Sequence, residues 1–128
     1  MGKLAYCTVG SNQLPKAKAF YDALLGTIAM RPVFEHPSGG RVYGGDGVPS
    51  FAVLGTFDGK PATAGNGSMF AFSFDSRAEV DAFHGRALSL GGTDEGAPGE
   101  RAPGMYFSYF RDLDGNKLCA FCIASART

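Results

Sequence analysis

The sequence predicts an α+β fold made of two βαβββ modules, and three observations support this prediction. Short apolar strand patterns alternate with one stretch of helical periodicity in each half of the chain. A shift of 63 positions overlays the two halves, so that Tyr6 falls on Met69 and Leu25 falls on Leu88. The chain ends with two aromatic and apolar stretches joined by an Asp-Leu-Asp-Gly-Asn turn at 112–116, which is typical of a hairpin.

The first half begins with a strand pattern over 4–9, followed by a helix over 15–25. Pro15 suits the first helical turn and Gly26 suits the end of the helix. The apolar positions of this helix share one face and are Ala17, Phe20, Tyr21, Leu24 and Leu25. The three strands expected after it cover 30–36, 41–43 and 49–55.

The same order returns after a linker at 56–68 that is rich in Gly and Ala. The elements expected there are a strand at 69–74, a helix at 77–90 capped by Ser76, a short edge strand within 92–96, a loop at 97–104 and the closing hairpin. A half of about 60 residues is marginal for burying a core by itself. We therefore expect repeats of about 1–62 and 67–128 to pack into a single domain covering 1–128.

Composition and charge argue against several classes of protein. Twelve basic residues balance twelve acidic ones without a charge block, so we expect neither nucleic acid nor a membrane as a partner. No stretch approaches the roughly 20 apolar residues of a membrane helix, and the first residues lack the apolar run of a secretory signal. The three cysteines are expected to be free thiols. These features favour a cytoplasmic globular protein.

Two stretches within this repeat resemble a known family. The helix run LPKAKAFYDALLG at 14–26 and the closing RDLDGN at 111–116 are similar to the vicinal oxygen chelate (VOC) superfamily, which includes glyoxalase I, bleomycin resistance proteins and extradiol dioxygenases. The resemblance covers nearly the whole chain. It implies that the modules form a curled mixed sheet around a ligand cleft, and that modules pair or exchange across a homodimer.

The resemblance also implies where a metal would bind. Metal-dependent members use His or Gln and Glu from one module and His and Glu from the other, and the metal acts as a Lewis acid. Transferred to this chain, the first-strand ligands fall on Tyr6 and Met69, and the last-strand glutamate of the second module falls on Cys119. The matching position of the first module falls within 51–53. None of these is the imidazole or carboxylate of typical Zn, Ni, Fe or Mn sites, so we expect no metal and no cofactor.

Residue alternation bears on the two closing strands. Cys119 and Cys122 lie three apart and point to opposite faces of a strand, which argues against a zinc or redox C-x-x-C site. Tyr106 and Ser108 share one face of the preceding strand, and Phe107 and Tyr109 share the other. The resemblance favours Tyr106 and Ser108 for the cleft. Cys119 is then either a small pocket-lining residue or a reactive thiol.

Other polar side chains have less specific interpretations. His36 and His84 have no partner at a recognisable catalytic spacing and are expected on the surface. Arg41 and Arg101 are either solvated charges or contacts for an anionic ligand beside the cleft. The sequence identifies no catalytic residue.

Three functions remain open on the sequence. The first is a glyoxalase- or bleomycin-resistance-like protein that binds a small molecule without a metal. The second is a lyase or dioxygenase-type metal-dependent enzyme with unrecognised ligands, and the third is a structural module without a ligand. For the first, the expected lining of an aromatic cleft is Tyr6, Phe51, Met69, Tyr106 and Cys119.

Overall fold

The computed structural model describes residues 1–124, in which the order β-α-β-β-β occurs twice. The first module contains β1 (Tyr6–Gly10), α1 (Leu14–Gly26), β2 (Arg31–Glu35), β3 (Arg41–Gly44) and β4 (Ser50–Leu54). The second contains β5 (Phe70–Ser73), α2 (Arg77–Ser89), β6 (Thr93–Ala102), β7 (Met105–Arg111) and β8 (Lys117–Ile123). The predicted α+β class with two βαβββ modules is confirmed. The last part of the expected second repeat, 125–128, lies outside the described residues.

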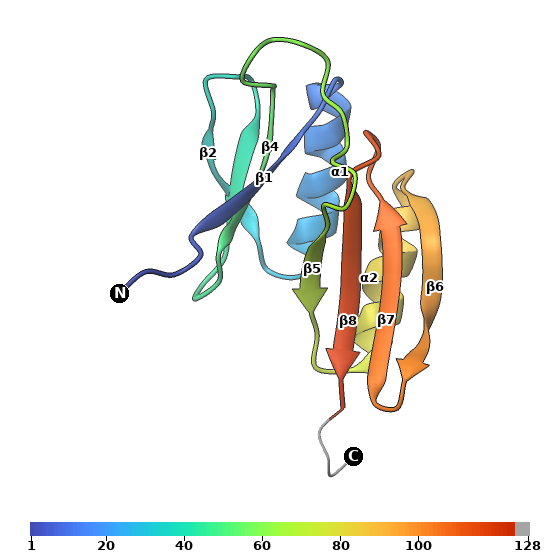
Figure 1. Ribbon diagram of the computed structural model, residues 1–128. Coiled ribbons are helices and arrows are strands. Elements are labelled where there is room, and N and C mark those ends of the chain that lie inside the picture. The colour runs from blue at the N-terminus through green and yellow to red at the C-terminus, as the bar shows by residue number, and fades with distance from the viewer. Residues whose placement is uncertain (125–128) are drawn as a thin grey trace.

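Each module forms its own mixed four-stranded sheet. The first sheet has the order β1-β4-β3-β2 and the second has the order β5-β8-β7-β6. Within each sheet the first and last strands of the module pair in parallel, and the remaining neighbours are antiparallel. Figure 1 shows the two sheets side by side and not closed on each other. The strands expected in one curled sheet therefore form two separate, open sheets.

Local sequence features mark the ends of the two helices. Ser76 caps α2 as expected, because its Oγ accepts from the Glu79 backbone N at 3.2 Å and donates to the Glu79 carboxylate at 2.9 Å. Gly91, just after α2, has a φ of 105°, which favours glycine. α1 ends at Gly26 as expected, and the residue with a left-handed backbone after it is Ala29, with a φ of 60°. No helix within residues 1–124 is long and apolar enough to cross a membrane.

The edge strand β6 is longer than the sequence suggested. The expected loop at 97–104 is largely strand, because β6 runs from 93 to 102 along β7. Its pairing shifts register between Gly96 and Gly99, so Pro98 falls within an irregularity. Proline is tolerated at bulges of edge strands, where a missing N–H costs little. The Pro and Gly content of this segment therefore indicated a bulged strand rather than a loop.

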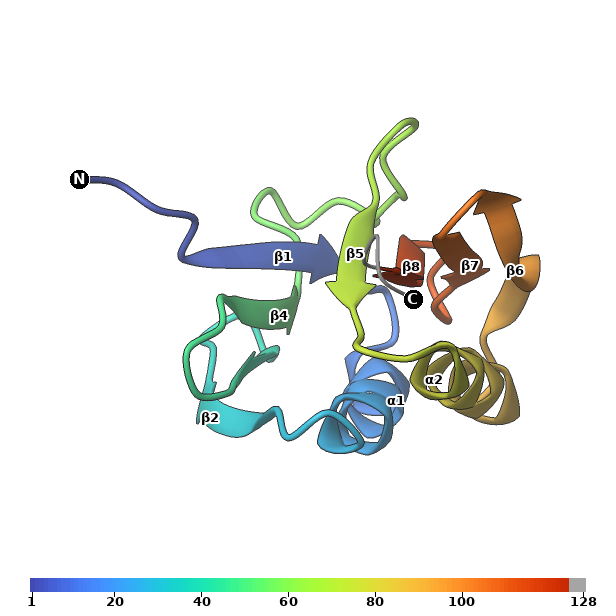
Figure 2. The same ribbon diagram turned by 90° about the horizontal axis from the view of Figure 1, so that it is seen from below.

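Aromatic side chains join the two modules. Figure 2 shows α1 and α2 side by side, with β5 and its neighbours across from them. The Phe51 ring of β4 lies 6.1 Å from the Phe70 ring and 6.0 Å from the Phe72 ring, both on β5. The same ring lies 5.1 Å from Tyr21 of α1. Phe51 is thus a buried core residue at the junction between modules.

The turn at 112–116 also fastens the modules together. The buried Asp112 carboxylate accepts from the Tyr21 hydroxyl of α1 at 2.5 Å and from the Asp114 and Asn116 backbone N–H groups at 2.9 Å. The Asn116 amide donates to the Gly10 carbonyl of β1 at 3.0 Å. Burial and the adjacent Asp112 raise the pKa of Tyr21 well above its ordinary value of 10.0. This hairpin turn is therefore a clasp between modules as well as a chain reversal.

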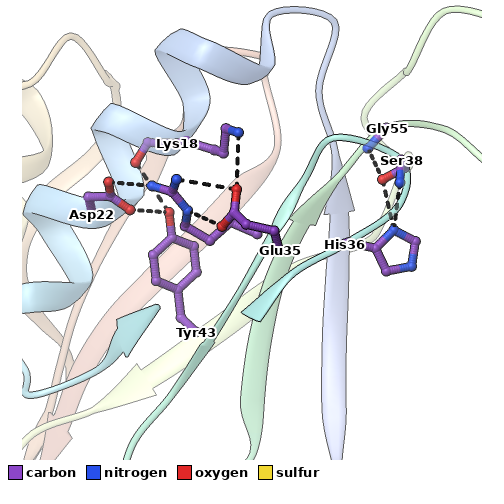
Figure 3. A network of polar contacts seen from close by, with 8 residues as sticks. Lys18, Asp22, Glu35, His36, Ser38, Tyr43 and Gly55 are labelled. Atoms are coloured by element: carbon purple, nitrogen blue, oxygen red, sulfur yellow. Dashed lines mark hydrogen bonds and ion pairs between the residues drawn. The ribbon is translucent and has the colours of Figure 1, made fainter. Parts of the chain in front are cut away.

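A polar network holds α1 against its own sheet (Figure 3). Arg41 of β3 donates to Asp22 of α1 at 2.6 Å and to Glu35 of β2 at 2.6 Å. The Tyr43 hydroxyl also donates to Asp22, at 2.6 Å, and Lys18 reaches Glu35. Arg41 is thus held by two carboxylates, which removes it as a contact for an anionic ligand.

Candidate functional site

The second sheet has one face against α2 and one face without a helix. On the helix side, the Tyr106 hydroxyl donates to Asp81 of α2 at 2.6 Å, and the Phe110 ring lies 6.0 Å from the Phe83 ring. Ser108 shares this face and is fully buried. Tyr106 and Ser108, expected at the cleft, therefore face α2, and the other face of β7 carries Phe107 and Tyr109.

We call the side of the second sheet that points away from α2 the open face. Its strand residues include Phe107 and Tyr109 of β7 and Lys117, Cys119 and Phe121 of β8. The strand register pairs Phe107 with Phe121 and Tyr109 with Cys119. The Phe107 and Phe121 rings stack at 4.9 Å with planes 12° apart, and the Phe107 and Tyr109 rings lie 6.3 Å apart at 28°. Three half-buried rings thus form a continuous aromatic row.

Two cations lie over one end of this row. The Lys117 Nζ is 5.0 Å from the centroid of the Tyr109 ring, and the Arg101 guanidinium carbon is 5.7 Å from the same centroid. Such distances are within the range of cation–π attraction. The open face therefore combines flat apolar surface with positive charge.

Cys119 lies on this face but is not an activated nucleophile. Its side chain is fully buried, and burial raises the pKa of the thiol to about 11, despite the opposing influence of Lys117 and Arg101. Thiolates are the reactive form, and activated cysteines have a lowered pKa. The raised pKa argues against a reactive thiol, and a role for Cys119 in lining a pocket stays a prediction.

A small hollow adjoins the cationic end of the open face. It has a volume of about 570 Å³ and is lined by the loop 64–68 together with Met69, Arg111 and Lys117. Arg111 is held by Glu95 at 2.8 Å and by the Gly115 carbonyl at 3.0 Å. Lys117 thus borders both the hollow and the aromatic row.

A larger groove lies between the modules, on the helix side of β5. Its volume is about 980 Å³, and its walls come from β1, β4, β5, α2 and the segment after α1. Cys7, Phe51, Met69, Phe72 and Phe83 are among the lining residues. Most of the lining is apolar, so this groove is a second candidate for a binding surface.

The five residues expected to line one cleft do not meet within the chain. Tyr6 is 65% exposed on the side of the first sheet away from α1, and Phe51 is buried in the core. Met69 borders both hollows. Tyr106 faces α2, and Cys119 alone lies in the open face beside the aromatic row. On β5, the residue paired with Cys119 is Ala71 rather than Met69.

Sequence reasoning missed four residues of the open face: Phe107, Tyr109, Lys117 and Phe121. A signal for them exists in the hairpin. The Asp112 backbone N donates to the Asn116 carbonyl at 2.9 Å, which closes the turn and fixes the register of both strands. Counting outward from that pair places Tyr109 opposite Cys119.

The histidines do not form a catalytic site. His84, expected on the surface, is 4% exposed; its Nε2 lies 3.1 Å from the Asp94 carboxylate and its ring lies against Phe110. It is therefore enclosed between α2 and the second sheet. His36 lies in the turn after β2, where its Nδ1 is 2.9 Å from the Ser38 hydroxyl (Figure 3).

The positions that carry metal ligands in metal-dependent VOC members do not fit a metal here. They hold an exposed phenol at Tyr6, a thioether at Met69 and a buried thiol of raised pKa at Cys119. Hard divalent cations prefer carboxylate and imidazole donors. Among residues 1–124, no three His, Cys, Asp or Glu side chains are grouped so as to hold a metal ion.

Known proteins resemble this chain in sequence and in fold. The sequence profile of the Glyoxalase/Bleomycin resistance protein/Dioxygenase superfamily matches residues 3–120. A crystal structure of a glyoxalase/bleomycin resistance protein from Albidiferax ferrireducens T118 shares 39% sequence identity at a TM-score of 0.84, covering 94% of this chain and 98% of that one. No curated protein sequence matches significantly.

Two more distant structures share the fold alone. A lactoylglutathione lyase from Agrobacterium tumefaciens is 21% identical at a TM-score of 0.71, covering 95% of this chain and 94% of that one. The fosfomycin resistance protein FosX from Listeria monocytogenes is 18% identical at a TM-score of 0.74, covering 99% and 97%. Since the profile spans both βαβββ modules and the hairpin turn that clasps them, the chain belongs to the glyoxalase/bleomycin resistance protein/dioxygenase superfamily.

Proposed function

We propose that this protein binds a small planar molecule on the open face of its second sheet, without a metal at the family's ligand positions. The observation that carries the proposal is the aromatic row of Phe121, Phe107 and Tyr109, whose rings stack on a face that α2 leaves uncovered. Aromatic walls with a few polar groups are typical of small-molecule sites. The names of the lactoylglutathione lyase and the fosfomycin resistance protein of similar fold both refer to small molecules, which agrees with this class.

A second copy of the chain completes the site in this proposal. The two sheets of one chain lie side by side, so the first sheet does not cover the open face of the second (Figure 1). The first sheet exposes Tyr6 and Phe34 on its side away from α1. Placed across the open face of a partner, this sheet would enclose the aromatic row between two sheets. We therefore expect a homodimer in light scattering at micromolar concentration, and a monomer would contradict this part of the proposal.

The proposal keeps three of the five residues named from the sequence. Cys119 lies within the open face, Met69 borders the hollow at its cationic end, and Tyr6 enters from the second copy. Phe51 and Tyr106 are assigned to the core and to the contact with α2. The single-domain organisation and the cytoplasmic location expected from the sequence stay predictions.

Binding of 2-naphthamide, a neutral planar probe, tests the proposal. We expect saturable binding by calorimetry, weakened about three- to tenfold by Phe107→Ala because one stacking partner is lost. The matched control is Phe57→Ala, which removes an equally large ring from an exposed position outside both hollows. Equal weakening by both substitutions would contradict the proposal, as would the absence of saturable binding by both 2-naphthamide and its carboxylate counterpart 2-naphthoate.

Metal analysis separates this proposal from the metal-dependent enzyme. The proposal expects no stoichiometric divalent metal in the purified protein and no shift of the melting temperature on adding Ni, Zn, Mn or Fe. A bound stoichiometric metal that stabilises the protein would favour the lyase or dioxygenase alternative, since a ligand specific for the native state raises stability.

A further inference from the structure

We propose that the open face selects a planar aromatic anion, such as an aromatic carboxylate, over its neutral counterpart. This inference rests on the proposed function, because it names the ligand class of the same site. The ring of the ligand would lie along Phe107 and Tyr109. Its negative charge would lie between Lys117 and Arg101.

The charge of this face is the first support. Glu95 neutralises Arg111, but no carboxylate of residues 1–124 lies within 4.0 Å of Lys117 or Arg101. Arg41, by contrast, is held by two carboxylates in the first module. The half-buried Lys117 and the exposed Arg101 therefore leave two positive charges beside the aromatic row, where they would attract an anion.

The convergence of the two cations is the second support. Lys117 comes from β8 and Arg101 from β6, which flank β7 on opposite sides, and both reach the Tyr109 ring of β7. Unrelated solvated charges have no reason to meet over one ring. Both also lie close enough to Cys119 to oppose the rise of its thiol pKa. The order of the three strands thus places Lys117 and Arg101 over the same ring.

Two glycines of β6 lie close to the Arg101 guanidinium. A Cβ at position 99 would lie 2.9 Å from Arg101 Nη1, and one at position 96 would lie 3.0 Å from Tyr109 Cδ2 and 3.3 Å from Arg101 Nη2. The distance of 2.9 Å is shorter than real Cβ atoms show, and the distances of 3.0 and 3.3 Å are tighter than nine in ten real Cβ contacts. The Arg101 guanidinium also donates to the Ala97 carbonyl at 2.8 Å, which fixes its position. Gly96 and Gly99 therefore make room for this cation above the ring.

The hollow at the end of the row is the third support. Its volume of about 570 Å³ has space for a charged substituent, and Lys117 forms part of its wall. A ligand with its ring on Tyr109 and its carboxylate toward Lys117 would use the flat surface, the charge and the hollow together. Charge-assisted hydrogen bonds to Lys or Arg are roughly twice as strong as neutral ones.

The test compares 2-naphthoate with 2-naphthamide, which share one ring system and differ in charge. We expect the wild-type protein to bind 2-naphthoate about tenfold more tightly, and this preference to fall as salt rises. Lys117→Gln and Arg101→Gln, separately and together, should reduce the preference toward one. Lys117→Arg should retain most of it. Lys60→Gln, on an exposed loop, is the matched control and should leave it unchanged.

The outcomes distinguish this inference from the function on which it rests. Equal affinity for both probes would overturn the anion preference and leave the planar-ligand proposal standing. Failure of both probes to bind would overturn the proposed function itself. A preference that survives Lys117→Gln with Arg101→Gln would also overturn the inference, because the charge would then be recognised elsewhere. Each preference is the ratio of two affinities measured on the same variant. A variant that is partly unfolded binds both probes less, and this loss does not change the ratio.

Discussion

At the scale of single residues, Cys119 is a buried thiol in the middle of the open face. Its place after the Asp-Gly-Asn turn identified it as the position of a metal-binding glutamate in relatives, and the structure places it on the open face. Its protonation state depends on burial, which neighbouring strands determine. Cys119 is a neutral thiol because Tyr109 and Ala71 lie beside it and exclude water.

Labelling with iodoacetamide tests this state. With a pKa of about 11, about one Cys119 thiol in a thousand is ionised near pH 8, against roughly a quarter for an ordinary exposed thiol. We expect the Cys119 peptide to react at least about a hundredfold more slowly in the native protein than in urea, measured by mass spectrometry. Comparable rates in both states would show an accessible, activated cysteine.

At the scale of elements, the β7–β8 hairpin carries the aromatic row of the open face, and its turn contacts the first module. Its existence and its Asp-Gly turn were predictable from the sequence. The contacts of that turn with α1 and β1 were not, because they depend on how two separate modules pack. The pairing of Tyr109 with Cys119 was recoverable from the turn register, whereas the resemblance favoured Tyr106 and Ser108, which face α2.

Gly115 offers a test of this turn. It has a φ of 89°, and a Cβ there would meet nothing closer than 4.0 Å, so its replacement by Ala introduces backbone strain alone. We expect Gly115→Ala to lower the free energy of unfolding by about 1–2 kcal/mol in urea titrations. Gly85→Ala, on the exposed side of α2 with open space around it, should instead raise it by about 0.5–1 kcal/mol. Matching effects would contradict the assigned geometry.

The Tyr21–Asp112 contact predicts a stability change at high pH. The pKa of Tyr21 is raised in the folded state, so its contribution is fully present below pH 10.0 and is lost as pH rises above that value. From about pH 9 to about pH 11 the wild-type protein should therefore lose more stability than Tyr21→Phe, which has no hydroxyl to ionise. Tyr6→Phe, at an exposed site, should follow the wild type. Parallel curves for wild type and Tyr21→Phe would contradict the contact.

At the scale of the whole molecule, the internal repeat predicted the architecture better than any single motif did. The overlay of Tyr6 on Met69 and Leu25 on Leu88 corresponds to two modules of the same element order. The relation between the modules was not predictable, because it depends on side chains such as Phe51 and Asn116 that contact the other module. The separation of the strands into two sheets, on which the proposed second copy rests, follows from that packing.

Cooperative unfolding tests whether the modules form a single domain. Because the 112–116 clasp and the Phe51 contacts cross between modules, we expect one transition in urea, coincident by far-UV and near-UV circular dichroism. Asn116→Ala removes the bond to Gly10 and should lower the free energy of unfolding by about 1–3 kcal/mol while keeping one transition. Two separate transitions in the wild type would show independent modules.

Amide chemical-shift mapping with 2-naphthamide tests the central claim most directly, because it distinguishes the open face from the larger groove between the modules. The account predicts saturable shifts at Phe107, Tyr109, Cys119 and Phe121, with Phe72 and Phe83 of the groove unchanged. Shifts centred on Phe72 and Phe83, with the residues of the aromatic row unaffected, would contradict it.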